Sequence, residues 1–256
     1  MGKDGEKAET LEKGNIYFMY RPKIEEEDPE SLSDIQRFYM ILSPENSKNL
    51  RLAIIGRKRL PDPGKSGRGK NWGFIDMVRN SPDAIREALE GETYKTKTRG
   101  ERHDPGAFPM MEGVYRILRH SGHTHLVYAL ELPEKPGEVQ QQAQVEEEAS
   151  YIINIKNPES GSPRAAGLSE ERKAKYPKYL QEKFDGKRFA DADPPAFLDK
   201  EGTEFLLVSA SENVEEELDM ELQPQDESVK SADIFTELRM DKSERTKKPL
   251  FEGKWE

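Results

Sequence analysis

Apolar and polar residues alternate in short runs along most of the chain, a pattern typical of β-strands that present two different faces. The runs are rich in β-branched and aromatic residues, and three of them end at a Pro-Glu pair, where proline cannot continue a hydrogen-bonded ladder. Strands therefore dominate the predicted structure. The predicted strands are 15–20, 38–42, 50–57, 72–78, 94–99, 114–120, 123–132, 151–155 and 205–208.

The clearest local prediction is a β-hairpin formed by 114–120 and 123–132, with Ser121-Gly122 as a two-residue turn. This pairing sets His120 opposite His123 and Leu118 opposite His125. Because side chains alternate between the faces of a strand, the hairpin has one apolar face and one mixed face. The apolar face, expected in the core, carries Tyr115, Ile117, Leu126, Tyr128 and Leu130; the mixed face carries Val114, Arg116, His120, His123, His125, Val127 and Ala129.

Two helices are predicted from capping residues and from apolar residues spaced four apart. The first covers 81–91, with Ser81 as N-cap, and the second covers 169–185, with a break near Pro177. Tight hairpins outnumber helical crossovers, which argues against a parallel sheet. We therefore expect an α+β fold, a mainly antiparallel sheet or half-barrel with two or three packed helices and an acidic C-terminal arm.

The expected organisation is a single domain flanked by two arms. Residues 1–14 form a polar arm, 15–221 the α+β domain, and 222–256 the C-terminal arm. Because the last arm keeps Phe251 and Trp255, we expect it to dock on its own domain or on a partner subunit, which would give a homo-oligomer.

Composition narrows the chemistry that the chain can perform. None of its 256 residues is cysteine, which excludes disulfides, thiolate zinc sites, iron–sulfur clusters and a cysteine nucleophile. The charged N-terminus lacks a signal-peptide stretch, and no apolar run approaches the ~20 residues of a membrane helix. We therefore expect a cytoplasmic protein without membrane contact.

Charge is spread unevenly over the chain, whose net charge is −10. Residues 51–125 hold 15 Lys and Arg against 9 Asp and Glu, whereas the remainder is strongly acidic. The acidic remainder repels phosphate at long range, which argues against general nucleic-acid binding. The basic centre can still bind a small anion.

Three histidines on the mixed face of the predicted hairpin, His120, His123 and His125, are candidate metal ligands. Two histidines that flank one residue on a strand, with a third across the ladder, can form a facial set with an open position, as in catalytic zinc sites. No carboxylate in the hairpin turn supplies the outer hydrogen bonds that ligating histidines need. The alternatives are ordinary surface histidines, or one histidine that binds an anion or transfers a proton.

A second candidate site is cationic. Arginine suits bidentate binding of phosphate or carboxylate, and His103 beside these cations is a candidate acid or base. The alternative is a solvated basic face that balances an acidic chain. The candidate ligand-binding residues are Arg57, Arg59, Lys95, Lys97, Arg99, Arg102 and Arg116.

No motif in the sequence identifies a reaction. The glycine-rich run 64–71 resembles a phosphate-binding loop, but Asn71 replaces the Ser or Thr that holds magnesium, and a strand follows instead of a helix. Three hypotheses follow: a non-enzymatic binding or interaction protein with a basic central surface, an enzyme or sensor for a small anionic ligand, and a metal-dependent hydrolase. The first leads because no catalytic motif is visible.

Overall fold

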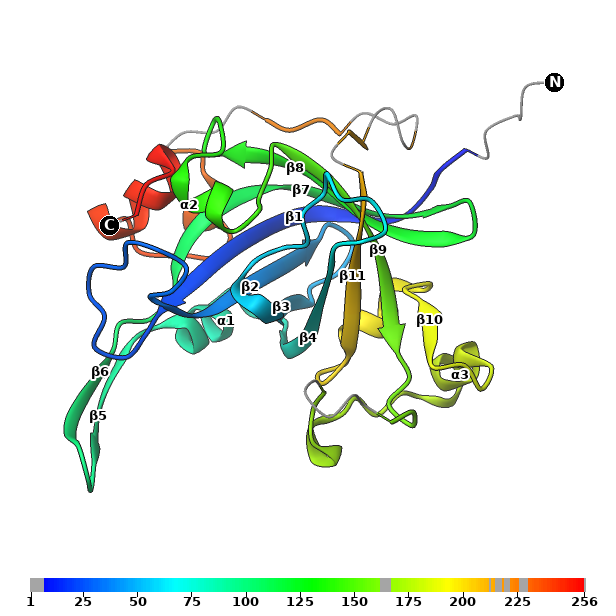
Figure 1. Ribbon diagram of the computed structural model, residues 1–256, viewed down its shortest axis with the longest axis horizontal. Coiled ribbons are helices and arrows are strands. Elements are labelled where there is room, and N and C mark those ends of the chain that lie inside the picture. The colour runs from blue at the N-terminus through cyan, green and yellow to red at the C-terminus, as the bar shows by residue number, and fades with distance from the viewer. Residues whose placement is uncertain are drawn as a thin grey trace.

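The structure is a closed, eight-stranded antiparallel β-barrel (Figure 1). This computed structural model describes residues 7–161, 167–211, 213, 214, 218, 222–225 and 230–255. Around the barrel the order is β1-β2-β3-β4-β11-β9-β8-β7, and pairing of β7 with β1 closes it. The strands are β1 (Glu9–Pro22), β2 (Ile35–Pro44), β3 (Leu50–Ile55), β4 (Lys70–Arg79), β7 (Phe108–His120), β8 (His123–Leu132), β9 (Glu148–Lys156) and β11 (Glu204–Ser211).

Three further strands lie outside the closed ring. β10 (Phe189–Asp191) pairs with the end of β9, while β5 (Glu92–Thr96) and β6 (Gly100–Asp104) form a separate two-stranded hairpin. The described helices are short, and α1 with eight residues is the longest of them. They are η1 (Gly56–Lys58), α1 (Pro82–Leu89), α2 (Glu138–Gln142), η2 (Glu170–Arg172), α3 (Lys178–Gln181), η3 (Glu182–Phe184), η4 (Pro195–Asp199), α5 (Asp233–Thr236), α6 (Glu244–Lys247) and η5 (Lys248–Glu252).

The predicted α+β fold is wrong, because the sheet closes on itself and the packed helices are only short turns. Closure comes from β9, which pairs with β11 along one edge and with β8 along the other. The helix predicted over 169–185, with a break near Pro177, is interrupted there: η2 precedes Pro177, and α3 and η3 follow it as two consecutive short turns. The helix predicted over 81–91 is present as α1.

The barrel is filled by side chains. Alternate residues of every barrel strand point inward, and aromatic rings such as Phe18, Phe38, Tyr128 and Tyr151 pack against one another there. We name the two ends of the barrel after the connections that they carry. Val139 and Ala143 plug the β3–β4 end, whose connection is 56–69, and Leu180, Phe184 and Phe197 plug the β7–β8 end, whose turn is Ser121-Gly122.

The C-terminal segment covers the outer wall of β1, β2 and β3. Ile234, Phe235 and Leu250 pack with α1 against Tyr17, Ile41 and other residues of this wall. The buried carboxylate of Glu112 fixes the segment, because it accepts hydrogen bonds from the backbone N–H groups of Asp233 (3.1 Å) and Ile234 (2.8 Å).

The predicted register of the β7–β8 hairpin is confirmed. His120 pairs with His123, Leu118 with His125, and Arg116 with Val127. Its mixed face is not simply solvated, however. Val214, Leu218 and Leu222 pack on Leu118, Val127 and Ala129, so a second outer wall is also covered.

Candidate functional site

The β5–β6 hairpin projects from the barrel as an isolated ribbon, which points away from the other elements (Figure 1). Five residue pairs hold the two strands together, from Glu92 opposite Asp104 to Thr96 opposite Gly100. Gly100 makes the turn possible, because its φ of 71° is a left-handed conformation that glycine adopts without strain. A two-stranded hairpin without a packed face is only marginally stable in water, so its base must be held by the rest of the protein.

Polar contacts with two neighbouring segments fix the base of the hairpin. Arg21 donates to the Asp104 carboxylate at 2.9 Å and to the carbonyl oxygen of Ala88 at 3.0 Å. Glu25 pairs with the Arg102 guanidinium at 3.0 Å and accepts a hydrogen bond from the backbone N–H of His103 at 2.9 Å. The base is therefore anchored from two sides, and the remainder of the ribbon is presented in a defined direction.

The tip of the hairpin carries three exposed cations, Lys95, Lys97 and Arg99. β5 ends at Thr96, so Lys97 and Arg99 lie in the turn and not within the predicted strand over 94–99. Lys95 lies 4.0 Å from Glu101 in a highly exposed pair, which contributes little. Lys97 and Arg99 make no ion pair with any described residue. The hairpin tip therefore carries positive charge that is not neutralised by nearby acids, on a ribbon whose base is anchored.

The other predicted cations lie elsewhere. Arg57 and Arg59 are exposed on the β3–β4 connection, which carries five basic residues and one acid over 56–69. Arg116 lies on the outer wall of β7. The structure therefore brings Lys95, Lys97, Arg99 and Arg102 together on one ribbon, and separates them from the other three. The seven do not line a single concave pocket.

His103 lies near the base of the hairpin, where its Nδ1 is 3.2 Å from the Thr93 hydroxyl. The cations at the hairpin tip lie beyond it, and its Nδ1 has an ordinary polar neighbour. Its predicted acid–base role stays a prediction.

The three hairpin histidines differ in their surroundings. His125 is buried, and its Nδ1 lies 3.0 Å from the Ser150 hydroxyl in a hydrogen bond. The ring of His120 lies 5.9 Å from that of His125, and His123 is exposed. Among the described residues, no group of three or more His, Cys, Asp and Glu side chains is arranged to hold a metal ion. The metal hypothesis therefore stays a prediction.

His125 makes the stability of the fold depend on pH. Burial, together with the neighbouring His120 and His123, lowers the pKa of His125 from its ordinary 6.5 to about 4. The unfolded chain takes up this proton below pH 6.5, whereas the folded protein does not until about pH 4. Stability is therefore full above pH 6.5 and falls as the pH drops towards 4, by up to about 1.4 kcal/mol per pH unit.

We expect His125→Gln to flatten the loss of stability between pH 6.5 and 5, because glutamine does not titrate. Urea unfolding at pH 7.5, 6.5, 5.5 and 5.0 measures this slope, and His103→Gln is the matched control at a histidine outside the barrel. Equal slopes for wild type and His125→Gln would refute the assignment.

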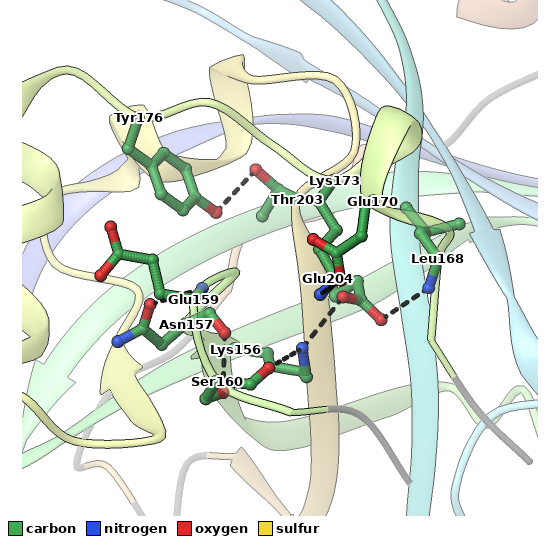
Figure 2. Close-up of polar contacts among 10 residues, drawn as sticks. All are labelled: Lys156, Asn157, Glu159, Ser160, Leu168, Glu170, Lys173, Tyr176, Thr203 and Glu204. Carbon is green, nitrogen blue, oxygen red and sulfur yellow. Dashed lines mark hydrogen bonds and ion pairs between the residues drawn. The ribbon is translucent and has the colours of Figure 1, made fainter. Parts of the chain in front are cut away.

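A buried polar cluster lies on the outer face of β9 and β11 at the β7–β8 end (Figure 2). The Lys156 ammonium lies 3.2 Å from a Glu204 carboxylate oxygen and donates to the carbonyl oxygen of Ser160, also at 3.2 Å. The other Glu204 oxygen accepts from the backbone N–H of Leu168 at 3.1 Å. Each charge has partners within the cluster, so the pair ties a surface loop to the barrel.

This pair was not predicted from the sequence, and neither was a second one inside the barrel, between Arg51 and Glu12. A signal for both was present, since Arg51 stands between Leu50 and Leu52, and Lys156 follows the apolar run of β9. A single charge within an apolar strand predicts a buried partner. It does not say where in the chain that partner lies.

Comparisons with known proteins add no relative. No protein-family description, curated protein or solved structure matches the chain significantly. No helix in the described part of the chain is both long and apolar enough to cross a membrane. Inference about function therefore rests on the geometry of the barrel and its projecting hairpin.

Proposed function

We propose that the protein is a non-enzymatic binding protein whose β5–β6 hairpin contacts an acidic surface of a partner protein. One observation carries the proposal: a ribbon anchored at its base projects three tip cations, two of which have no ionic partner among the described residues. Exposed polar ribbons gain little stability from their own fold. Such a ribbon has a physical purpose if it holds a positively charged contact surface away from the acidic body of the protein.

The charge distribution favours an acidic protein over nucleic acid as the partner. A net charge of −10 repels an extended polyphosphate, whose charges reach well beyond the hairpin. A small carboxylate patch can contact the hairpin tip alone. Because salt screens charges that are more than about 8 Å apart, the acidic body of the protein repels such a patch less than it repels an extended polyphosphate. The hairpin also carries Glu101 among its cations, so it presents a pattern of both charges that the surface of a partner protein can match.

The small-ligand alternative has less support from the arrangement. Its seven cations would have to converge on one ligand, and three of them, Arg57, Arg59 and Arg116, lie on other elements. A contact with a protein surface needs no convergence, because the tip residues can each meet a separate carboxylate.

We expect the triple variant Lys95→Glu, Lys97→Glu, Arg99→Glu to raise the Kd for a fluorescein-labelled decaglutamate peptide by about tenfold or more. Each exposed ion pair contributes about 0.2–1 kcal/mol, and reversed charges add repulsion. Fluorescence anisotropy at 50 and 200 mM salt measures the affinity, and the salt dependence should weaken in the variant.

The control variant Lys7→Glu, Lys48→Glu, Lys178→Glu makes the same charge change at exposed positions away from the hairpin. It should reduce peptide binding far less than the tip variant. Equal losses in both variants would reduce the effect to net charge and end the proposal. Tighter binding of a 20-base-pair DNA duplex than of the peptide would assign the tip to nucleic acid instead.

A further inference from the structure

A third outer wall of the barrel, on β4, β11 and β9, lacks the cover that the other two have. Its outward residues lie in two rows set by the strand register, Trp72 with Leu206 and Asn154, and Lys70 with Val208 and Ile152. These residues are only half-buried or exposed, and none belongs to a buried apolar cluster. By contrast, Tyr17 and Ile41 under the C-terminal segment are fully buried.

Two aromatic rings extend this wall. Phe189 of β10 reaches over the edge of the sheet, and its ring lies 5.9 Å from that of Trp72. The Arg188 guanidinium lies 5.8 Å from the Phe189 ring centre, so a cation borders the apolar strip. The wall therefore offers aromatic and aliphatic surface, and among the described elements β10 reaches over it at Trp72.

A hollow adjoins the strip where β10 approaches the β7–β8 turn. Asn154 and Phe189 line it together with His123, Lys183, Lys187 and Asp191. Asp193 also borders it, but the Arg119 guanidinium binds that carboxylate. Lys183 has no ionic partner among the described residues, and Lys187 lies 3.9 Å from Asp185 in an exposed pair. Around the strip the cations Lys70, Lys183, Lys187 and Arg188 outnumber the acids Asp185 and Asp191, so its surroundings are mainly basic.

We infer that this wall binds an acidic peptide segment of a partner protein, whose apolar side chains lie on Trp72, Leu206, Val208 and Ile152 while its carboxylates meet Lys183 and Lys187. Charge selects this occupant. A second copy that presented the same wall would bring like charges together. Single-stranded nucleic acid needs a row of stacking rings, whereas most of this strip is aliphatic.

The chain supplies its own reporter for a test. It has two tryptophans, and Trp255 is buried beside Tyr20, so emission from a Trp255→Phe variant comes from Trp72 alone. Random 12-residue peptides are selected by phage display on the full-length protein, and the enriched peptides are synthesised and titrated into the Trp255→Phe protein.

We expect the enriched peptides to carry net negative charge and several apolar residues, and to shift Trp72 emission to shorter wavelength. The exposed-site variant Lys183→Glu, Lys187→Glu should weaken them at least tenfold, and Leu206→Asp should abolish the shift. The hairpin-tip variant should leave their affinity unchanged, so this inference and the proposed function can fail separately.

Four results of the peptide selection and of the peptide and oligonucleotide titrations would overturn the inference. They are the absence of enriched peptides, enrichment of neutral or basic peptides, binding that leaves Trp72 emission unchanged, and an emission shift produced by oligo(dT) in place of peptide. Concentration-dependent self-association that Leu206→Asp abolishes would assign the wall to a second copy and would also refute it.

Discussion

Replacing Glu204 with alanine is expected to lower the free energy of unfolding by about 3–5 kcal/mol, because the substitution leaves the Lys156 ammonium buried without its counter-charge. The side chain of Lys156 is 0% exposed and that of Glu204 is 5% exposed, so water cannot replace the lost partner without structural change. The backbone N–H of Leu168 also loses its acceptor. Urea unfolding monitored by circular dichroism at pH 7.5 measures the change.

The double variant Lys156→Met, Glu204→Leu distinguishes two contributions to the free energy of unfolding: the destabilisation by an unpaired buried charge and the net stabilisation by the intact ion pair. Apolar residues of similar volume often replace a buried ion pair at little cost, so the double variant should be markedly more stable than Glu204→Ala. A double variant as unstable as the single one would show that the loop contacts, and not the charge pairing, hold this region together.

Replacing Glu12 with alanine is expected to cost about 3 kcal/mol, for a related reason inside the barrel. Glu12 accepts two hydrogen bonds from Arg51, at 2.6 and 2.9 Å, and one from the Tyr115 hydroxyl at 2.8 Å. Burial alone lowers the pKa of an arginine, but Glu12 outweighs it, so the pKa of Arg51 lies above its ordinary value. Asp199 still accepts from Arg51 at 2.8 Å, which places the cost at the low end for a broken buried pair.

The matched control is Asp199→Asn. Asp199 accepts one hydrogen bond from Arg51, whereas Glu12 accepts two, and Asp199 is the more exposed of the two acids. Its side chain is 25% exposed compared with 14% for Glu12, so we expect a loss of about 1 kcal/mol. Equal losses for the two variants, measured by the same urea titration, would contradict the assignment of Glu12 as the main partner of Arg51.

The two buried pairs show how some of the many charged residues are accommodated inside the fold. Charged residues make up 35% of it, and the structure places a few of them where they close the barrel wall or fix a loop. Arg51 joins β3 to β1 and to η4, while Lys156 joins β9 to β11. Such pairs favour one strand arrangement, because any other would bury a charge alone.

Local structure was largely predictable from the sequence. Alternation located every barrel strand, and the Ser121-Gly122 turn set the register and the inner face of the β7–β8 hairpin correctly. Strand alternation and turn residues are both local features of the sequence. They can be recognised without knowing which distant parts of the chain meet. The β6 strand was missed because Gly100–Asp104 lies among turn-forming residues and is held as a strand only by its pairing with β5.

Closure of the barrel was not predictable in the same way. It depends on β9 lying between β8 and β11, and β11 is separated from β9 by nearly fifty residues that include β10 and several short helices. Nor does periodicity say which outer wall is covered. Leu118 and Val127 meet Val214 and Leu218 from a distant segment, whereas Leu206 and Val208 have an equally apolar pattern and no described cover.

The candidate site shows the same limit. The sequence placed Lys95, Lys97 and Arg99 close together because they are neighbours in the chain. It could not show that they lie on a ribbon anchored by Arg21 and Glu25, or that Arg116 lies apart from them on the outer wall of β7. Convergence of distant cations is a property of the fold, and here the fold separates them.

The proposed binding role depends on the hairpin tip being the surface that meets the partner. Amide chemical shifts of the full-length, ¹⁵N-labelled protein, recorded with and without the decaglutamate peptide, locate the contact directly. We expect shifts over 94–102, with the largest at the turn between β5 and β6 and little change in the barrel strands. Shifts confined to the β3–β4 connection or to the barrel walls, with the hairpin unchanged, would contradict the proposed binding role.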